Sequence, residues 1–405
     1  MSECLICQTY YEPFISFGKM PIANGFLSPD QYGKEYFFEL KAGFCPNCNM
    51  VQLVEQPDRE MMFHEEYAFF SSTSARMTLH FKKFADLVAE NLKSSDPFVV
   101  EIGSNDGIML QNFAKANIRH LGIEPSANVA REAINKGIQT ISEFFDEKLA
   151  KKIVDEHGQA DAVLAANVMC HIPYLHSVAA GIKILLKPDG VFMFEDPYLG
   201  DIVEKVSYDQ IYDEHAFYFS VASVRYLFEQ HELEVTDVMP QNVHGGSMRY
   251  VISHKGSREI SPAVVKQREK EQQLALHLLA TFEQLHNNIE SSKNELIELL
   301  NDIRKQGKRI VGYGATSKST TVNNYCRIGP DLVEFISDTT PIKQGKYTPG
   351  AHIPVRPYQD FSDNYPDYAL LFAWNHAEEI MAKEQKFMES GGKWIVYVPK
   401  VQVLA

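Results

Sequence analysis

The chain has 405 residues, and because a domain usually spans about 100–200 residues, we expect two or three domains. Apolar residues make up 45% and charged residues 23% of the chain, which is ordinary for a globular protein. This composition excludes the collagen-like, disordered and coiled-coil classes. The net charge of −14 argues against a nucleic-acid groove or an anionic membrane surface as the main partner, while a local basic pocket for a phosphate group remains compatible with it.

No run of apolar residues reaches the roughly 18 residues that a membrane helix needs. The first ten residues, MSECLICQTY, are polar and acidic and include two cysteines, which is unlike a signal peptide. We therefore expect a cytoplasmic protein without a membrane partner.

Four of the six cysteines form two CxxC pairs within the first 70 residues, which are otherwise aromatic and rich in turns. The pairs are Cys4 with Cys7 and Cys45 with Cys48, and each offers two thiolates from one tight turn. We expect a structural Zn²⁺ site, closed by four thiolates; unrelated reduced thiols or a redox pair are the alternatives. Cys170 and Cys326 are expected to be buried apolar side chains.

From about residue 72 the pattern changes to alternating helices and strands. Apolar runs that are typical of buried strands alternate with segments of helical spacing. The expected strands are 98–102, 119–123, 162–166 and 191–195, and the expected helices are 77–93, 106–117, 127–136 and 174–186. This alternation predicts an α/β fold with a doubly wound parallel sheet. Segments 233–239 and 247–254 are expected to form a closing antiparallel hairpin.

A glycine-containing turn follows strand 98–102, and an acidic residue, Glu124, ends the next strand. A carboxylate at that place can bind both ribose hydroxyls of a nucleoside ligand. The turn lacks the GxGxxG pattern that a pyrophosphate requires, so it favours S-adenosylmethionine over a nicotinamide or flavin cofactor; a bare tight turn is the other alternative. Phe144 is a candidate for the adenine contact, and Asn167 ends the fourth strand near the expected methyl group. The turn contributes the candidates Glu101, Gly103, Asn105, Asp106 and Gly107.

Two polar segments follow strand ends, where open α/β sheets bind their ligands. The first contains His171, and the second contains Tyr212, Glu214 and His215. A carboxylate or a phenol beside an imidazole can orient it and tune its basicity, so these residues are candidate catalytic groups. His244 and Arg249, which flank Gly245-Gly246, are candidate substrate contacts, or alternatively part of an ordinary hairpin entry.

Ser261 followed by Pro262 is typical of a helix start, and the polar stretch to about Gln306 predicts two helices or one long connector. Strand 309–313 then opens a second α/β region with another glycine-containing turn. Its glycines, hydroxyls and ammonium group suit a pyrophosphate at a helix start, although a structural turn is an equal alternative. The candidate substrate contacts of this region are Gly314, Thr316, Lys318, Ser319, Asp338, Asn375 and His376.

Several motifs together resemble one known family. They are CLIC, CPNCNMVQL, VEIGSNDGIML, CHIPYLHS, FEDPYLGDIVEKVSYDQIYDEH, VHGGSMRY, VGYGATSKS, TPGAHIPVRP and YALLFAWNHAEEIMAKE. In order and density they are similar to those of the nucleotide-sugar C-methyltransferases that make branched deoxysugars. The resemblance implies a zinc-binding module in residues 1–70 and a class I, Rossmann-like S-adenosylmethionine methyltransferase domain in 71–256. A helical connector and a second Rossmann-like domain that binds the nucleotide sugar are implied in 257–405.

The resemblance also implies a substrate and a set of catalytic residues. The nearest members act on C3 of thymidine-diphosphate (TDP) 4-keto-deoxyhexoses, and a monomer is the expected state. The family's catalytic positions fall on His215, Glu214, Tyr212, His171 and Tyr67. His215, oriented by Glu214, is expected to take the C3 proton, and Tyr212, His171 and Tyr67 are expected to stabilise the enolate or hold the sugar. Methyl transfer to oxygen or nitrogen, and nucleotide-sugar oxidoreduction, are the alternatives.

Overall fold

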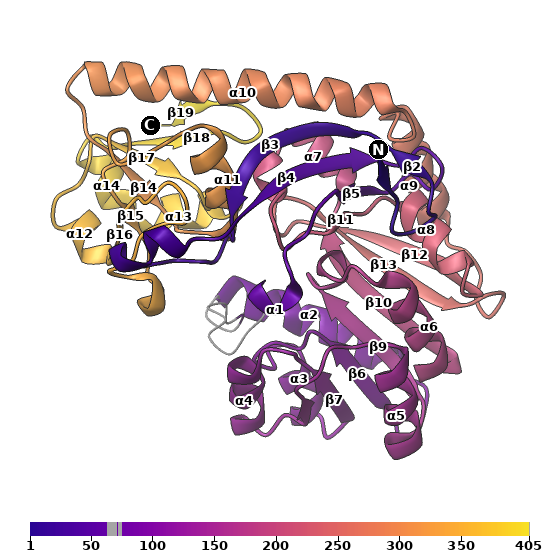
Figure 1. Ribbon diagram of the computed structural model, residues 1–405. Helices are drawn as coiled ribbons and strands as arrows, with labels where there is room; N and C mark the ends of the chain where they lie inside the picture. Colours follow the sequence, from indigo (N-terminus) through magenta and orange to yellow (C-terminus); the bar gives the residue numbers. More distant parts are fainter. Residues whose placement is uncertain (63–70, 72–74, 405) are drawn as a thin grey trace.

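The computed structural model describes residues 1–62, 71 and 75–404 and arranges them around three large sheets (Figure 1). The central sheet has seven strands in the order β12-β13-β10-β9-β6-β7-β8. β13 is antiparallel to both of its neighbours, and the other pairings are parallel. The strands are β6 (Phe98–Ile102), β7 (Arg119–Ile123), β8 (Thr140–Ile141), β9 (Ala160–Ala166), β10 (Leu186–Pro197), β12 (Leu233–Gln241) and β13 (Ser247–His254).

Alternate residues of a strand point to opposite faces of the sheet, and both faces of this sheet carry apolar side chains. Helices therefore cover both faces. Val100, Val163 and Phe192 pack into one core with α5, α6 and α8. Val99, Leu164 and Met193 pack into another with α2 and α3. The helices are α2 (Ala75–Asn91), α3 (Leu110–Lys115), α4 (Ala127–Asn135), α5 (Glu147–His157), α6 (Leu175–Leu185) and α8 (Val221–Glu229). The predicted doubly wound α/β layer is therefore confirmed, and α5 is a helix that the sequence pattern did not predict.

The amino-terminal segment contains an antiparallel sheet, and two of its strands span the gap between the two CxxC pairs. β3 (Pro13–Pro21), β4 (Phe37–Phe44) and β5 (Val51–Leu53) are joined by β11 (Phe217–Tyr218), which pairs with β5. This sheet packs under the long helix α10 through the rings of Phe14, Phe44 and Phe282 (Figure 1). The pairing of β11 fixes the segment just after residue 215 to the cysteine-bearing module.

The carboxyl-terminal part begins with two helices and continues as a second α/β sheet. Ser261 caps α9 (Pro262–Gln273) by accepting the N–H of Ala263, as predicted. α10 (Leu279–Lys305) buries an apolar stripe, and the sheet has the order β16-β15-β14-β17-β18-β19. Its strands are β14 (Ile310–Tyr313), β15 (Ile336–Ser337), β16 (Val355–Arg356), β17 (Tyr368–Leu371), β18 (Lys393–Val396) and β19 (Gln402–Leu404). The first glycine turn of this sheet leads into α11 (Ser317–Tyr325).

The remaining elements are short. They are β1 (Ser2–Glu3), β2 (Tyr10–Tyr11), α1 (Arg59–Met62), α7 (Leu199–Lys205), α12 (Tyr358–Ser362), α13 (Ala377–Lys383) and α14 (Gln385–Glu389). The 3₁₀ turns include the six-residue turn Pro29–Lys34 and the three-residue turns Met169–His171 and Pro341–Lys343. Among the described residues, no helix combines the length and the apolarity that crossing a membrane requires.

Candidate active site and zinc centre

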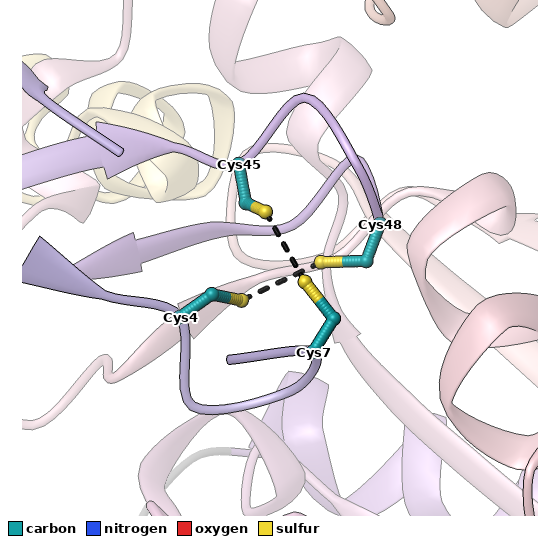
Figure 2. A group of neighbouring side chains, drawn as sticks. All are labelled: Cys4, Cys7, Cys45 and Cys48. Carbon is teal, nitrogen blue, oxygen red and sulfur yellow. Dashed lines mark hydrogen bonds between the residues drawn. The ribbon is translucent and has the colours of Figure 1, made fainter. Parts of the chain in front are cut away.

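The four cysteines of the CxxC pairs converge on one point, although they come from two separate turns (Figure 2). Their sulfur atoms all lie within 4.8 Å of one another, with 3.5 Å between Cys4 and Cys48 and 3.4 Å between Cys7 and Cys45. Zinc–sulfur bonds of about 2.3 Å in a tetrahedron place sulfurs about 3.8 Å apart, so the donor set fits Zn²⁺. Four thiolates close the coordination shell, which makes this centre structural.

A cavity of about 350 Å³ opens at the carboxyl ends of the central strands. Its wall comes from all three parts of the chain: Asn24 from the amino-terminal module, Gly103 from the central sheet, and Thr316 from the start of α11. The edge formed by the carboxyl ends of parallel strands is where open α/β sheets bind ligands.

One half of the cavity contains the residues predicted to bind S-adenosylmethionine. Gly103, Asn105, Glu124, Phe144 and Asn167 line it. The carboxylate of Glu124 accepts the main-chain N–H of Asn105 (3.1 Å) and of Ser126 (2.8 Å), which holds the turn closed. Burial raises the pKa of Glu124. Gly103 adopts a φ of +66°, and a Cβ there would lie 2.3 Å from Cγ2 of Val168, so the backbone passes the cavity floor at a distance that only glycine allows.

The other predicted members of this turn lie behind it instead of lining the cavity. Glu101 is buried, and burial together with nearby Glu124 and Asp106 raises its pKa well above the usual value. Asp106 forms an ion pair with Lys136 (3.0 Å). Gly107 passes close to Ile138. These three residues shape the turn from beneath.

His215 is buried and is held through both ring nitrogens. Its Nδ1 lies 2.8 Å from the main-chain oxygen of Gln210, which can only accept, so Nδ1 carries the proton. Nε2 therefore has the lone pair and accepts a hydrogen bond from the hydroxyl of Tyr212 (2.9 Å). Burial lowers the pKa of His215 well below 6.5, and the neighbouring His171 and Lys318 add to this shift. The imidazole is neutral at pH 7, with its lone pair at the cavity wall.

The partner that orients His215 differs from the expected one. The sequence suggested Glu214, but the carboxylate of Glu214 accepts a hydrogen bond from the amide of Asn24 (2.6 Å). Asn24 in turn accepts the hydroxyl of Ser317 (3.0 Å), so one chain of hydrogen bonds joins the three parts of the molecule. The main-chain carbonyl of Gln210 performs the orienting role instead.

Of the other predicted catalytic residues, one lies at the cavity wall and one lies outside the described part of the chain. His171 lines the cavity next to His215, with 5.3 Å between the ring centroids, and burial lowers its pKa to about 4. Tyr67 lies outside the described residues.

The other half of the cavity is basic. Thr316 and Lys318 line it, together with Lys343, which sequence analysis did not identify. The ammonium of Lys318 donates to the main-chain oxygen of His244 (3.3 Å), and that of Lys343 donates to the oxygen of Ala315 (2.9 Å). Burial lowers the pKa of both lysines. Within the described part of the chain, neither ammonium forms a salt bridge, although Asp209 interacts electrostatically with Lys318, and Asp338 and Glu214 interact with Lys343.

Gly314, Ser319 and Asp338 support this second turn without lining the cavity. Asp338 accepts the main-chain N–H of Ala315 (2.7 Å), and Ser319 donates its hydroxyl to the oxygen of Thr316 (2.6 Å). Gly314 takes a φ of +88° beside Ala373.

The remaining predicted substrate contacts lie in two places. His244, from the glycine-rich segment after β12, and Asn375 and His376, from the 3₁₀ turn Trp374–His376, line the cavity, and burial lowers the pKa of His244 to about 3. Arg249 instead lies opposite Glu195 on the neighbouring strand and forms a buried ion pair with it (2.7 Å). Its guanidinium stacks 3.6 Å from the ring centroid of Phe84, away from the cavity.

The cavity wall also includes residues that sequence analysis did not single out. Asn24, Arg59 and Lys343 lie outside every quoted motif, and Tyr174, Gln210 and Ser317 lie within motifs but were not named as candidates. The guanidinium of Arg59 lies 4.1 Å from the ring centroid of Phe144. The end of the zinc-binding module therefore covers the half of the cavity that Phe144 lines, which we call the cofactor half. A polar side chain in a short turn carries no periodic signal, which is why these positions were missed.

Comparisons with known proteins match most of the chain. Residues 4–63 match a family model described as a zinc binding domain, residues 75–238 a methyltransferase domain, and residues 242–399 a C-methyltransferase C-terminal domain. C-methyltransferase NovU from Streptomyces niveus is 34% identical over 409 residues, covering 100% of this chain and 97% of NovU.

Solved structures match part of the chain. A methyltransferase from Anabaena variabilis is 17% identical, with a TM-score of 0.35 over 44% of this chain and 86% of that one. Magnesium protoporphyrin IX methyltransferase from Synechocystis is 15% identical, with a TM-score of 0.32 over 44% and 79%.

Proposed function

This chain belongs to the C-methyltransferase family, and we propose that it transfers the methyl group of S-adenosylmethionine to C3 of a TDP-4-keto-deoxyhexose. One observation carries the proposal. A single cavity is lined by the glycine turn after β6, by His215 with its Nε2 lone pair, and by the ammonium groups of Lys318 and Lys343.

The cofactor half fits S-adenosylmethionine in shape and chemistry. Gly103 and the carboxylate of Glu124 line this half, and a carboxylate in this position can accept hydrogen bonds from the hydroxyls of a ribose. Phe144 offers an apolar face for a base. When bound there, S-adenosylmethionine supplies an electrophilic methyl group.

His215 is the proposed base. A C–H bond beside a ketone is acidic because the charge moves onto the carbonyl oxygen. His215 is neutral, and its Nδ1–H is fixed on Gln210, so Nε2 takes the C3 proton and Nδ1 remains protonated. The positive charge gained by the ring is then balanced by the negative charge that develops on the substrate oxygen.

Tyr212 and His171 are the proposed partners of the developing enolate. In this structure the Tyr212 hydroxyl donates to Nε2 of His215, so the Tyr212 hydrogen bond must be released before the base can act. A ketone oxygen beside Tyr212 would receive that donor, which frees the lone pair when substrate is in place. Donors aimed at an oxyanion in a water-poor site contribute strongly to catalysis.

The lysine half supports a diphosphate-bearing substrate. Lys318, Lys343 and the amino-terminal end of α11 direct positive charge into one region of the cavity. Holding the charge of two ammonium groups in a partly buried wall costs solvation, and a diphosphate offsets that cost. Proximity of two ligands bound in one cavity then contributes to the rate.

The test is a methyl-transfer assay with a TDP-4-keto-6-deoxyhexose and S-adenosylmethionine that carries a deuterated methyl group. We expect a product whose deuterated methyl is assigned to C3 by NMR spectroscopy. A methyl group on oxygen or nitrogen would contradict the proposal. So would the absence of product from a panel of TDP- and UDP-linked 4-keto sugars while S-adenosylmethionine binding is intact.

A further inference from the structure

A second cluster of metal-ligating side chains lies at the cavity wall, away from the four-cysteine centre. We propose that Cys170, His171 and His215 form a site for a thiophilic divalent cation such as Zn²⁺, whose binding blocks methyl transfer. The part that concerns catalysis rests on the proposed role of His215, and the binding itself does not.

The geometry of the three side chains fits such an ion. The sulfur of Cys170 and one ring nitrogen each from His171 and His215 all lie within 4.8 Å of one another, the same limit that the structural zinc centre meets. Tetrahedral zinc with sulfur and nitrogen ligands needs separations of about 3.3–3.8 Å, so binding requires the ligand atoms to approach one another by at most about 1.5 Å. The two histidine rings are already nearly stacked, with 25° between their planes.

The three ligands come from two neighbouring segments of the chain. Cys170 and His171 are consecutive residues of the 3₁₀ turn Met169–His171, which follows β9. His215 comes from the loop that leads into β11. Three protein ligands of mixed sulfur and nitrogen type, with one position open, are the usual composition of an accessible zinc site. The open position faces the cavity, because His171 and His215 both line it.

His215 makes the second hydrogen bond that a metal-bound histidine usually makes. Histidine ligands of metals almost always donate their second N–H to a carbonyl or a carboxylate, which fixes the ring and the tautomer. His215 already donates Nδ1–H to the oxygen of Gln210 (2.8 Å), leaving Nε2 for the ion. On the other side, the carboxyl group of Asp196 accepts the main-chain N–H of Cys170 (3.2 Å), which holds the turn that carries the sulfur.

Binding requires no oxidant, because the hydrated ion exchanges bound waters for the sulfur of Cys170 and for one ring nitrogen each of His171 and His215. The thiol of Cys170 releases its proton to solvent as the sulfur–zinc bond forms. The ion replaces the Tyr212 hydroxyl as the partner of Nε2 on His215, so the lone pair proposed for proton abstraction is occupied. Zinc in excess of the structural ion is therefore expected to inhibit methyl transfer, and a bound substrate is expected to oppose it.

The test uses the full chain with its structural zinc in place. Equilibrium dialysis against rising buffered free zinc, with the bound metal measured by atomic emission, counts the ions. We expect the wild type and Cys326→Ala to take up a second ion, and Cys170→Ala and His215→Gln to take up only the first. Cys326 is the matched control, since it is equally buried and lies beside Tyr208. Cys170→Ser is a second variant, in case removal of the larger side chain disturbs folding.

The outcomes separate this proposal from the proposed function, because zinc uptake needs no sugar substrate. Failure of the wild type to take up a second ion would overturn it, as would a second ion retained by Cys170→Ala and Cys170→Ser. Where methyl transfer is measured, the zinc concentration for half-inhibition should rise by more than about tenfold in Cys170→Ala, since even loss of an outer contact of a metal site costs about 10–100-fold.

Discussion

The surroundings of His215 determine which of its ring nitrogens carries a proton and lower the pKa of its imidazole. The carbonyl of Gln210 fixes one nitrogen, Tyr212 donates to the other, and burial keeps the ring neutral. A neutral imidazole with a defined lone pair is what proton abstraction from carbon requires.

The pH dependence of catalysis should report this environment. Because the pKa of His215 is lowered well below 6.5, the free enzyme keeps its base deprotonated as the pH falls from 8 to 6.5. The profile of kcat/KM is therefore expected to stay flat over that range and to fall only at lower pH. An acid limb centred at or above pH 6.5 would assign the base to another group.

At the scale of elements, the strand-to-turn positions were the predictable part of the site. Gly103 and Glu124 directly follow strands and Thr316 caps the helix after β14, and the strand period together with glycine placement identifies such positions. Arg249 was predicted to contact the substrate, because the sequence alone does not show which residue of the neighbouring strand lies opposite it. In the structure β13 pairs it with Glu195 on the face that contacts α2.

The first glycine turn gives a direct test of the cofactor half. Gly103→Ala combines a φ of +66° with a Cβ 2.3 Å from Val168, so we expect S-adenosylmethionine binding to weaken by at least about tenfold, the equivalent of 1.4 kcal/mol. Gly137→Ala is the matched control, because its φ is +81° but nothing lies within 4 Å. Isothermal titration calorimetry compares the two variants, and equal affinities would contradict the assignment of this turn.

The zinc module is linked to the site through one strand pair. β5 of the module pairs with β11, which begins two residues after His215, and the carboxylate of Asp213 accepts the main-chain N–H of Ala23 (3.1 Å). Removing the structural zinc with a chelator should therefore lower both the melting temperature and turnover, although the ion takes no part in the chemistry. Readdition of one equivalent should restore both quantities. Full turnover in protein shown to be zinc-free would contradict this link.

At the scale of the whole molecule, the site exists because three distant segments converge. Asn24, Glu214 and Ser317 form one chain of hydrogen bonds, yet they belong to different parts of the sequence. The α/β layers, the CxxC centre and many cavity residues were predictable from local patterns. The β5–β11 pairing and Lys343 were not, since strands of three and two residues and a single lysine in a short turn leave no periodic signal.

The two halves of the cavity can be tested separately, because each is proposed to bind a different ligand. Saturating S-adenosylmethionine and thymidine diphosphate should each stabilise the protein, by about 2.7 kcal/mol at a hundred times the Kd. Lys318→Met and Lys343→Met are expected to lose the shift in melting temperature from thymidine diphosphate and to keep that from S-adenosylmethionine. Lys386→Met, on the exposed face of α14, is the control. A retained thymidine diphosphate shift in both lysine variants would move the diphosphate site elsewhere.

If His215 removes a proton from C3, that carbon should exchange its hydrogen with solvent in the presence of the enzyme. The protein is incubated in deuterated buffer with a TDP-4-keto-6-deoxyhexose and without S-adenosylmethionine, and deuterium at C3 is followed by mass spectrometry. We expect exchange in the wild type and in His254→Gln, whose histidine lies at the end of β13 outside the cavity wall.

In His215→Gln the rate should fall by about 10²–10⁴-fold, because a glutamine side chain has no basic nitrogen, while both ligands still bind. Exchange in His215→Gln at the wild-type rate would contradict the account.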